Sequence, residues 1–136
     1  MQGPSYGWLA IADGSAHWPE DYPVLDDIAS LTLQTAVAGL TTRQQVTANN
    51  IANLETPGFT ASTVSFESTL ANAVAAGDPS SARVSVNPSS AAAGVNGNNV
   101  SLDGEIVTAT KTGLQEKLLT GALTAKYGLI GTVLKG

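Results

Sequence analysis

Residues 49–59 of this chain, NNIANLETPGF, place three asparagines directly before a Pro-Gly pair. Asparagine weakens helices because its side-chain amide competes for nearby backbone groups. Pro57 disfavours the α region for Thr56, and Pro57-Gly58 suits the two central positions of a type II turn. These residues therefore predict a helix that ends here and a chain that then turns sharply.

The three asparagines need an explanation, because each of them lowers the stability of the helix. Asn49 and Asn53 are four residues apart, and Asn50 and Asn53 are three apart, so on a helix their amides lie on adjoining faces. From those faces they can hydrogen-bond a neighbouring helix. The alternative interpretation is a fraying last turn, in which asparagine follows only its usual turn preference.

Two long segments carry helical periodicity. The first spans residues 25–54, and the second spans residues 101–134, where Ser101 can act as N-cap and Asp103 and Glu105 lie in the first turn. The first helix has one seam with steps of three and four residues, with Gln44 and Thr47 inside it. Its apolar members are Leu33, Val37, Leu40, Ile51 and Leu54.

The second helix carries two apolar seams side by side, but one partner helix covers only one seam. We therefore expect an exposed apolar stripe, which usually marks an association surface. Its glycines also weaken this helix in isolation, each by up to about 1 kcal/mol. The large members of the first seam are Leu102, Ile106, Leu123, Tyr127, Ile130 and Leu134, and those of the second are Val107, Leu114, Leu118 and Leu129.

The middle of the chain predicts little regular structure. Phe66, Leu70 and Val74 mark one face of a short helix, after a weak alternation over residues 60–65. Residues 77–99 are rich in Gly, Pro, Ser and Asn, and we expect them to be irregular and partly disordered. Within them, a brief strand is indicated only at residues 84–86, and Asn96-Gly97 suits a tight turn.

The expected fold is therefore mainly α. Its two long terminal helices form an antiparallel coiled-coil hairpin, joined by a short helix and an irregular, partly disordered middle region. Residues 1–23 show neither helical nor strand periodicity and predict an irregular N-terminal extension. A hairpin of this kind that simply dimerises is one interpretation, and a subunit that adds head-to-tail into a filament is the other.

Composition argues against several classes of protein. The net charge is −5 and no stretch clusters Lys or Arg, so we expect no nucleic-acid partner. With no cysteine and His17 as the single histidine, no zinc site is predicted. Neither a nucleophile motif nor a phosphate-binding loop occurs, so we expect no enzyme activity, cofactor or small-molecule substrate. We also expect no membrane span and no cleavable export signal.

The asparagine block and the turn resemble the N-terminal signature of the flagellar axial proteins, the family of rod, hook and hook-associated subunits. The family pattern is Ala-Asn-Asn-hydrophobic-Ala-Asn followed by Thr-Pro-Gly-aromatic. The residues that fill its named polar, turn and aromatic positions here are Asn49, Asn50, Asn53, Thr56, Pro57, Gly58 and Phe59.

Further stretches resemble the short proximal-rod members of that family. They are residues 24–28 (VLDDI), residues 43–45 (RQQ) and residues 98–103 (NNVSLD), the last being similar to the entry to the family's C-terminal helix. Ser101 and Asp103 replace the more usual Asp and Glu there. Together with the signature, the resemblance covers roughly residues 24–75 and 97–136.

This resemblance implies a structural subunit of the proximal rod of the flagellar basal body, required for motility. In that family the terminal helices form an inner coiled-coil layer of the rod. The implied partners are other copies of the chain, FlgC and other rod proteins, FliE, and the flagellar export gate. The implied route is the flagellar type III system, which delivers subunits to the rod in the periplasmic and cell-wall space. The alternatives are another short axial protein such as FlgC, or a soluble helical adaptor or export chaperone.

The family has no equivalent of residues 1–23. Met1 is the only methionine, and Val24 stands where the family begins, so we expect translation to start there at a GTG codon. The alternative is a lineage-specific tail. Residues 24–136 are then a single rod-protein domain, in which residues 24–59 form the first helix and turn, 60–100 the middle region and 101–136 the last helix. We expect the isolated subunit to be partly disordered before assembly.

Overall fold

The computed structural model of the chain describes residues 21–135, and it describes side chains for residues 27–128, 131, 132 and 135. The described chain is mainly helical, as predicted, and it also contains a small two-stranded sheet. His17 lies outside the described residues, and Val24, the expected translation start, lies in the described backbone with its side chain outside the described set. The elements are α2 (Asp21–Ala52), β1 (Ser62–Ser65), α3 (Glu67–Ala75), the 3₁₀ helix η1 (Pro79–Ser81), β2 (Ser85–Pro88) and α4 (Leu102–Lys135).

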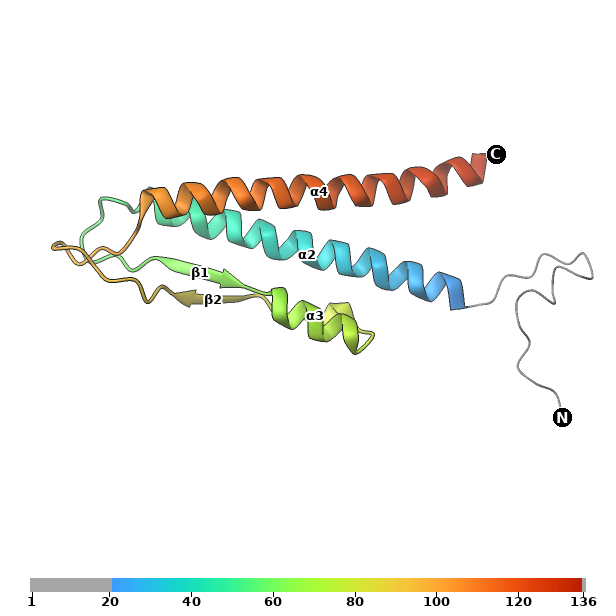
Figure 1. Cartoon of the computed structure of the whole chain (residues 1–136), viewed down its shortest axis with the longest axis horizontal. Helices are drawn as coiled ribbons and strands as arrows, with labels where there is room; N and C mark the ends of the chain where they lie inside the picture. Colours follow the sequence, from blue (N-terminus) through green and yellow to red (C-terminus); the bar gives the residue numbers. More distant parts are fainter. Residues whose placement is uncertain (1–20, 136) are drawn as a thin grey trace, which may run out of the picture.

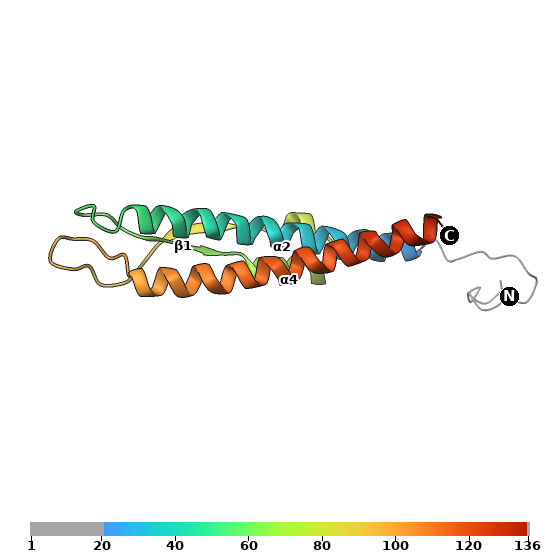
Figure 2. The ribbon, with the colours of Figure 1, turned by 90° about the horizontal axis from the view of Figure 1, so that it is seen from above.

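Helix α2 lies in the centre of the molecule. Helix α4 runs beside it in the opposite direction, and the strand pair with α3 lies along the other side of α2 (Figure 1). The view from above shows α2 and α4 side by side along most of their length (Figure 2). The start of α2 and the end of α4 therefore lie at the same end of the molecule. No helix in the described range combines the length and apolarity that crossing a membrane requires.

Helix α2 differs from the prediction at both ends. It begins at Asp21, so residues 21–23 are helical and not part of an irregular extension. Pro23 fits there because the N–H groups of a first turn have no intrahelical acceptor, and proline lacks only that N–H. At the other end α2 stops at Ala52, two residues before the predicted end.

The predicted type II turn is confirmed. The N–H of Phe59 donates to the carbonyl of Thr56 at 3.2 Å, and Gly58 has a φ of 71°. A positive φ at the third position of the turn is what a type II turn requires, and glycine adopts it without steric cost. Helix α3 is confirmed as well, with Phe66 at its N-terminus buried.

Residues 60–100 are more regular than predicted. Strand β1 pairs with β2 in antiparallel register, with Val64 opposite Val86, and the N–H of Ser89 extends the pairing to the carbonyl of Ala61 at 2.7 Å. The prediction of an irregular middle was wrong here because β2 is mostly Ser, Asn and Pro. Its pairing depends on a partner about twenty residues earlier, and local periodicity does not reveal such a partner.

The buried apolar core is small and lies where α2 meets the middle region. Its members are Leu40, Ala61, Phe66 and Ala73. The Phe66 ring rests directly on Gly39, since a Cβ built at that glycine would lie 2.7 Å from the ring. Glycine is therefore required at position 39 by close approach, and it fixes where the middle region docks on α2.

Candidate assembly surfaces and the signature junction

Asn50 joins three elements through one side chain. It is 1% exposed. Its Nδ2 donates to the carbonyl of Ser62 at 2.8 Å and to Oε1 of Glu105 at 3.0 Å. Its Oδ1 accepts from the N–H of Ser62 at 3.0 Å. Asn50 therefore ties α2 to β1 and to α4, and the prediction that an asparagine reaches a neighbouring helix is confirmed for this residue.

Asn49 and Asn53 instead close the last turn of α2. Nδ2 of Asn53 donates to the carbonyl of Asn49 at 2.9 Å, and its Oδ1 accepts from the Thr56 hydroxyl at 3.1 Å. Neither side chain bonds another helix within the described structure. For these two residues the prediction was wrong and the turn-forming alternative holds, because successive helical positions point about 100° apart and only Asn50 faces β1 and α4.

Asn98 caps the C-terminal end of α2 from outside the helix. It is 8% exposed, and its Nδ2 lies 2.9, 3.1 and 2.8 Å from the carbonyl oxygens of Asn53, Leu54 and Thr56. These three residues follow the last residue of α2, so the two amide hydrogens of Asn98 hold the turn through which the chain leaves the helix. Its Oδ1 accepts from the N–H of Val100 at 2.7 Å, which directs the chain into α4.

Two glycine turns pack against each other beside Asn98. The N–H of Gly58 donates to the carbonyl of Asn96 at 2.9 Å, and a Cβ built at Gly97 would lie 3.2 Å from Cα of Gly58. Gly97 has a φ of 78° and follows the turn instead of occupying its centre. The tight turn predicted at Asn96-Gly97 is thus shifted by one residue, with Gly97 in the left-handed position that ends a three-residue loop.

Asn99 completes this junction. Its Oδ1 accepts from the N–H of Ala61 at 2.7 Å, and its Nδ2 donates to the carbonyls of Ser89 and Ala91 at 3.3 and 3.1 Å. It therefore connects the start of β1 to the exit from β2. We define the signature junction as Asn50, Gly58, Gly97, Asn98 and Asn99.

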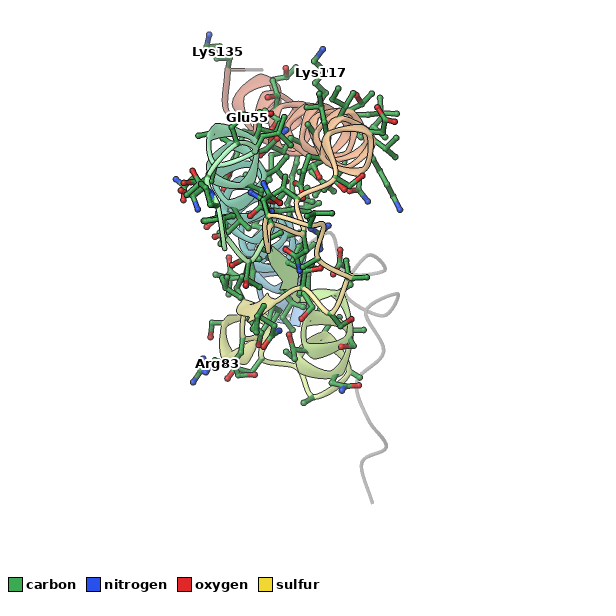
Figure 3. The ribbon with its side chains drawn as sticks, turned by 90° about the vertical axis from the view of Figure 1, so that its left-hand side faces the viewer. Glu55, Arg83, Lys117 and Lys135 are labelled. Atoms are coloured by element: carbon green, nitrogen blue, oxygen red, sulfur yellow. The ribbon has the colours of Figure 1, made fainter. Side chains whose placement is uncertain are left out.

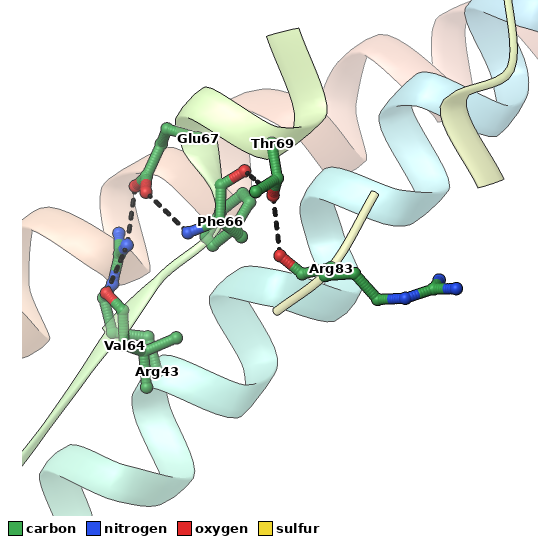
Figure 4. A network of polar contacts seen from close by, with 6 residues as sticks. All are labelled: Arg43, Val64, Phe66, Glu67, Thr69 and Arg83. Atoms are coloured by element: carbon green, nitrogen blue, oxygen red, sulfur yellow. Dashed lines mark hydrogen bonds and ion pairs between the residues drawn. The ribbon is translucent and has the colours of Figure 1, made fainter. Parts of the chain in front are cut away.

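Arg43 fixes the start of α3 against α2 (Figure 4). Its guanidinium lies 2.6 Å from the Glu67 carboxylate, donates to the carbonyl of Val64 at 3.0 Å, and stands 5.0 Å from the centre of the Phe66 ring. Partial burial raises the pKa of Glu67. The hydrogen bonds from Arg43 and from the N–H groups of Phe66 and Glu67 outweigh it, so the pKa lies below its ordinary value.

Helix α4 turns a polar face toward α2. Nε2 of Gln44 donates to the carbonyl of Ala109 at 3.2 Å, and the hydroxyl of Thr41 donates to Glu116 at 3.4 Å. Thr112 on this face is 1% exposed. On α2, the predicted seam faces inward, and all of its members are buried or half-buried: Leu33, Val37, Leu40, Gln44, Thr47, Ile51 and Leu54.

Most of the large apolar residues of α4 whose side chains are described are exposed. Leu123 is half-buried, and Ile130 and Leu134 have side chains outside the described set. Figure 3 shows the Lys117 side chain projecting from α4, away from the Arg83 side of the molecule. The exposed apolar side chains of α4 are Leu102 (41%), Ile106 (50%), Val107 (66%), Leu114 (60%), Leu118 (66%) and Tyr127 (52%).

Comparison with known families gives one match. Residues 31–60 match the family model described as flagella basal body rod protein. This match supports the rod family. It runs from within α2 to just past the signature turn and does not extend to the middle region or α4. No curated protein is significantly similar to the chain.

The match supports a structural role in the flagellar basal body and assembly with other rod proteins. It suggests a protein that is not an enzyme. Within the described residues, no three His, Cys, Asp or Glu side chains come together as a possible metal site. The arrangement of side chains instead offers a rigid polar junction at one end and an open apolar face along α4.

Sequence reasoning found some members of the junction and missed the roles of others. The signature identifies Asn50 and Gly58. Asn98 and Asn99 enter only through their resemblance to the start of the family's C-terminal helix, and nothing in local periodicity shows that they cap α2 and join the strands. Arg43 and Gly39 lie on the α2 face that meets the middle region, a face to which the seam analysis gave no partner.

Proposed function

We propose that this chain is FlgB, a structural subunit of the proximal rod of the flagellar basal body, and that it serves flagellum-dependent motility. The terminal helices α2 and α4 assemble through coiled-coil contacts with other subunits. The partners are further copies of the chain, FlgC and other rod proteins, FliE and the export gate. The flagellar type III system delivers the subunit to the rod in the periplasmic and cell-wall space.

The observation that carries this proposal is the division of α4 into two faces. Its polar face is satisfied by α2 within one chain, whereas Val107, Leu114 and Leu118 are 60–66% exposed. An exposed apolar face of this extent usually marks a surface that other protein covers. Together with the rod-family match on α2, it supports a subunit that is completed by its neighbours.

Deletion of the gene, followed by fractionation of basal bodies, tests this function. The deletion strain is expected to be non-motile and to lack rods, and the tagged wild-type chain is expected in the rod fraction. Motile deletion cells, or a protein that stays in the cytoplasm bound to one partner, would contradict a rod subunit. The second result would favour the adaptor or chaperone.

The distinction between FlgB and FlgC needs a separate test. The neighbouring reading frames are expected to encode FlgC and FliE, and site-directed cross-linking in basal bodies is expected to join the chain to both. A second, better match to the FlgB pattern elsewhere in the same genome would reassign this chain to FlgC or another short axial protein.

A further inference from the structure

Asn96 is the one asparagine in the sequence that is followed by glycine. The chain has eight asparagines, and the other seven precede bulkier residues. Glycine has no Cβ, so the backbone nitrogen of Gly97 is open to approach by the side chain before it. A bond from that nitrogen to Cγ of Asn96 closes a small, unstrained ring. The pair is therefore chemically suited to the loss of ammonia from the Asn96 amide.

The loop that carries this pair is open to water. It lies at the end of the molecule where α2 ends and α4 begins (Figure 1). All residues from 90 to 97 are exposed. Water and hydroxide can therefore reach the loop, and both are needed for the exchange of an amide for an acid.

The Asn96 side chain is held in a turn with its own backbone. Its Oδ1 accepts from the N–H of Asn98 at 3.1 Å, the arrangement known as an Asx turn. The ring closed by this hydrogen bond contains Cγ of Asn96 and the nitrogen of Gly97, the two atoms that must bond. When the nitrogen attacks, negative charge develops on Oδ1, and the N–H of Asn98 is already placed to stabilise it. The Asx turn therefore favours ring closure within the folded chain.

Two further hydrogen bonds act on the attacking nitrogen. The carbonyl oxygen of Asn96 accepts from the N–H of Gly58 at 2.9 Å. This bond polarises the peptide group between Asn96 and Gly97, so the Gly97 N–H loses its proton more readily. The Gly97 N–H also donates to the carbonyl of Gly94 at 2.9 Å, and this bond must break before attack. Because Gly94 is exposed, water can replace that donor.

We propose that Asn96 is a modification site that deamidates in the folded chain and thereby opens the signature junction. The deprotonated nitrogen of Gly97 bonds to Cγ of Asn96. The bond from Cγ to Nδ2 then breaks, and ammonia leaves with the proton that Gly97 gave up. Water opens either carbonyl–nitrogen bond of the resulting succinimide and gives aspartate or isoaspartate at position 96. The site belongs to the loop itself, so it is independent of the role of the chain in the rod.

Isoaspartate at position 96 does not keep the contacts that Asn96 makes. It adds one methylene to the main chain, and it turns the carbonyl that accepts from Gly58 into a carboxylate on a branch. The two glycine turns leave no room for a longer chain, since a Cβ built at Gly97 would lie 3.2 Å from Cα of Gly58. Aspartate keeps the main chain and the side-chain oxygen, so only the isoaspartyl product opens the junction.

Peptide mapping of aged protein tests the site. The folded chain is kept in mildly alkaline buffer at physiological temperature for several weeks, beside a sample in urea that serves as the positive control for the chemistry. Mass spectrometry is expected to find the amide-to-acid mass increase at Asn96, with isoaspartate exceeding aspartate, and to find Asn98 and Asn99 unchanged. Conversion of the urea sample alone would overturn the proposal, since the fold would then protect Asn96.

The effect on the junction is measured on the deamidated fraction, which anion exchange separates by its added negative charge. Asn96→Asp is the matched control, because it carries the same charge without the added methylene. The ratio of unfolded to folded chain is expected to rise about fivefold in the aged fraction, as for the loss of one backbone hydrogen bond. For Asn96→Asp it should stay within about twofold of wild type. Equal ratios would overturn the link to the junction.

Amide hydrogen exchange provides a local measurement at the junction. The N–H of Gly58 is expected to exchange faster in the deamidated fraction, because it loses its acceptor. The N–H of Leu70, which donates to the Phe66 carbonyl at 2.8 Å, is the control and should exchange at its former rate. Repair by an isoaspartyl methyltransferase returns isoaspartate to aspartate and should restore slow exchange at Gly58. Exchange at Gly58 that is the same before deamidation, after it and after repair would overturn the opening of the junction.

Discussion

The polar side chains of the signature junction find their partners within the chain, whereas the apolar side chains on the outer face of α4 remain exposed. At the junction, Asn50, Asn98 and Asn99 direct their amides to groups of the same chain, and little of Asn50 or Asn98 is exposed. Along α4, leucine and valine side chains lie in the open. Polar bonds thus fix how the two ends of the chain are joined, whereas apolar surface is left for other molecules.

This difference explains why hydrogen bonds, and not apolar contacts, join the two ends of the chain. Hydrogen bonds are directional, so they define one arrangement of α2, β1 and α4 even with a small apolar core. Apolar contacts are roughly proportional to area and tolerate adjustment. A subunit must present a fixed shape and still fit against several neighbours. Hydrogen bonds inside the chain provide the fixed shape, and apolar contacts on the outside allow the fit to neighbours.

The largest effect is expected from Asn50→Ala. It removes the buried Asn50 amide, so the Glu105 carboxylate and both backbone groups of Ser62 lose their hydrogen-bond partner. The expected loss in the free energy of unfolding is about 3 kcal/mol. Asn49→Ala removes an exposed side chain and is the matched control, with an expected cost below about 0.5 kcal/mol. Urea unfolding followed by circular dichroism measures both. Equal costs would remove the distinction between junction and surface asparagines.

Gly39→Ala is expected to have the next largest effect. The added Cβ would lie 2.7 Å from the Phe66 ring, so α3 must shift away from α2 at a cost of about 2 kcal/mol. Phe66→Leu in the same chain makes room and should recover part of that loss. A double variant no more stable than Gly39→Ala would show that the ring does not cause the strain.

Much of the fold could be predicted from the sequence where the cause is local. The type II turn follows from Pro57 and Gly58, and α3 and α4 follow from apolar spacing and end signals. The pairing of β2 with β1 and the cap from Asn98 could not, because each depends on a partner far away in sequence. A residue such as Asn98 shows no periodicity, and its role appears only when the end of α2 lies beside it.

For the candidate assembly surfaces, too, the sequence predicted local features better than contacts between distant segments. The α2 seam was predicted as an apolar stripe, and in the structure its members are buried or half-buried. The α4 seams were predicted as apolar stripes, but which residues meet α2 was left open. In the structure the polar face of α4 carries that contact, through Gln44, Thr41 and Asn50 on α2. Binary patterning alone assigns apolar residues to the inside and does not anticipate this.

A smaller effect with the opposite sign is expected from Gly121→Ala. This glycine lies on the exposed side of α4 in open space, so alanine should stabilise the isolated chain by up to about 1 kcal/mol through its higher helix propensity. Thermal unfolding of the purified chain measures this gain, and Gly128→Ala, also in open space, provides a second position. A loss of stability would mean that the outer face of α4 is already packed within one chain.

The smallest effect is expected from the ion pair at Arg43. The pKa of Glu67 lies below its ordinary value of 4.5, so the pair stabilises the fold above that value, and this contribution is lost as the pH falls through the folded pKa. The Glu67 side chain is 56% exposed, which limits the contribution to about 0.5 kcal/mol. Glu67→Gln should therefore be less stable than wild type at pH 7 and equal to it near pH 3, as measured by urea unfolding. In an Arg43→Met background the difference at pH 7 should shrink, because only the backbone N–H groups of Phe66 and Glu67 then hold the carboxylate. If the difference is unchanged there, the backbone N–H groups at the start of α3, rather than Arg43, hold the carboxylate, and the joint between α2 and the middle region depends on Phe66 packing and the Asn50–Ser62 hydrogen bonds.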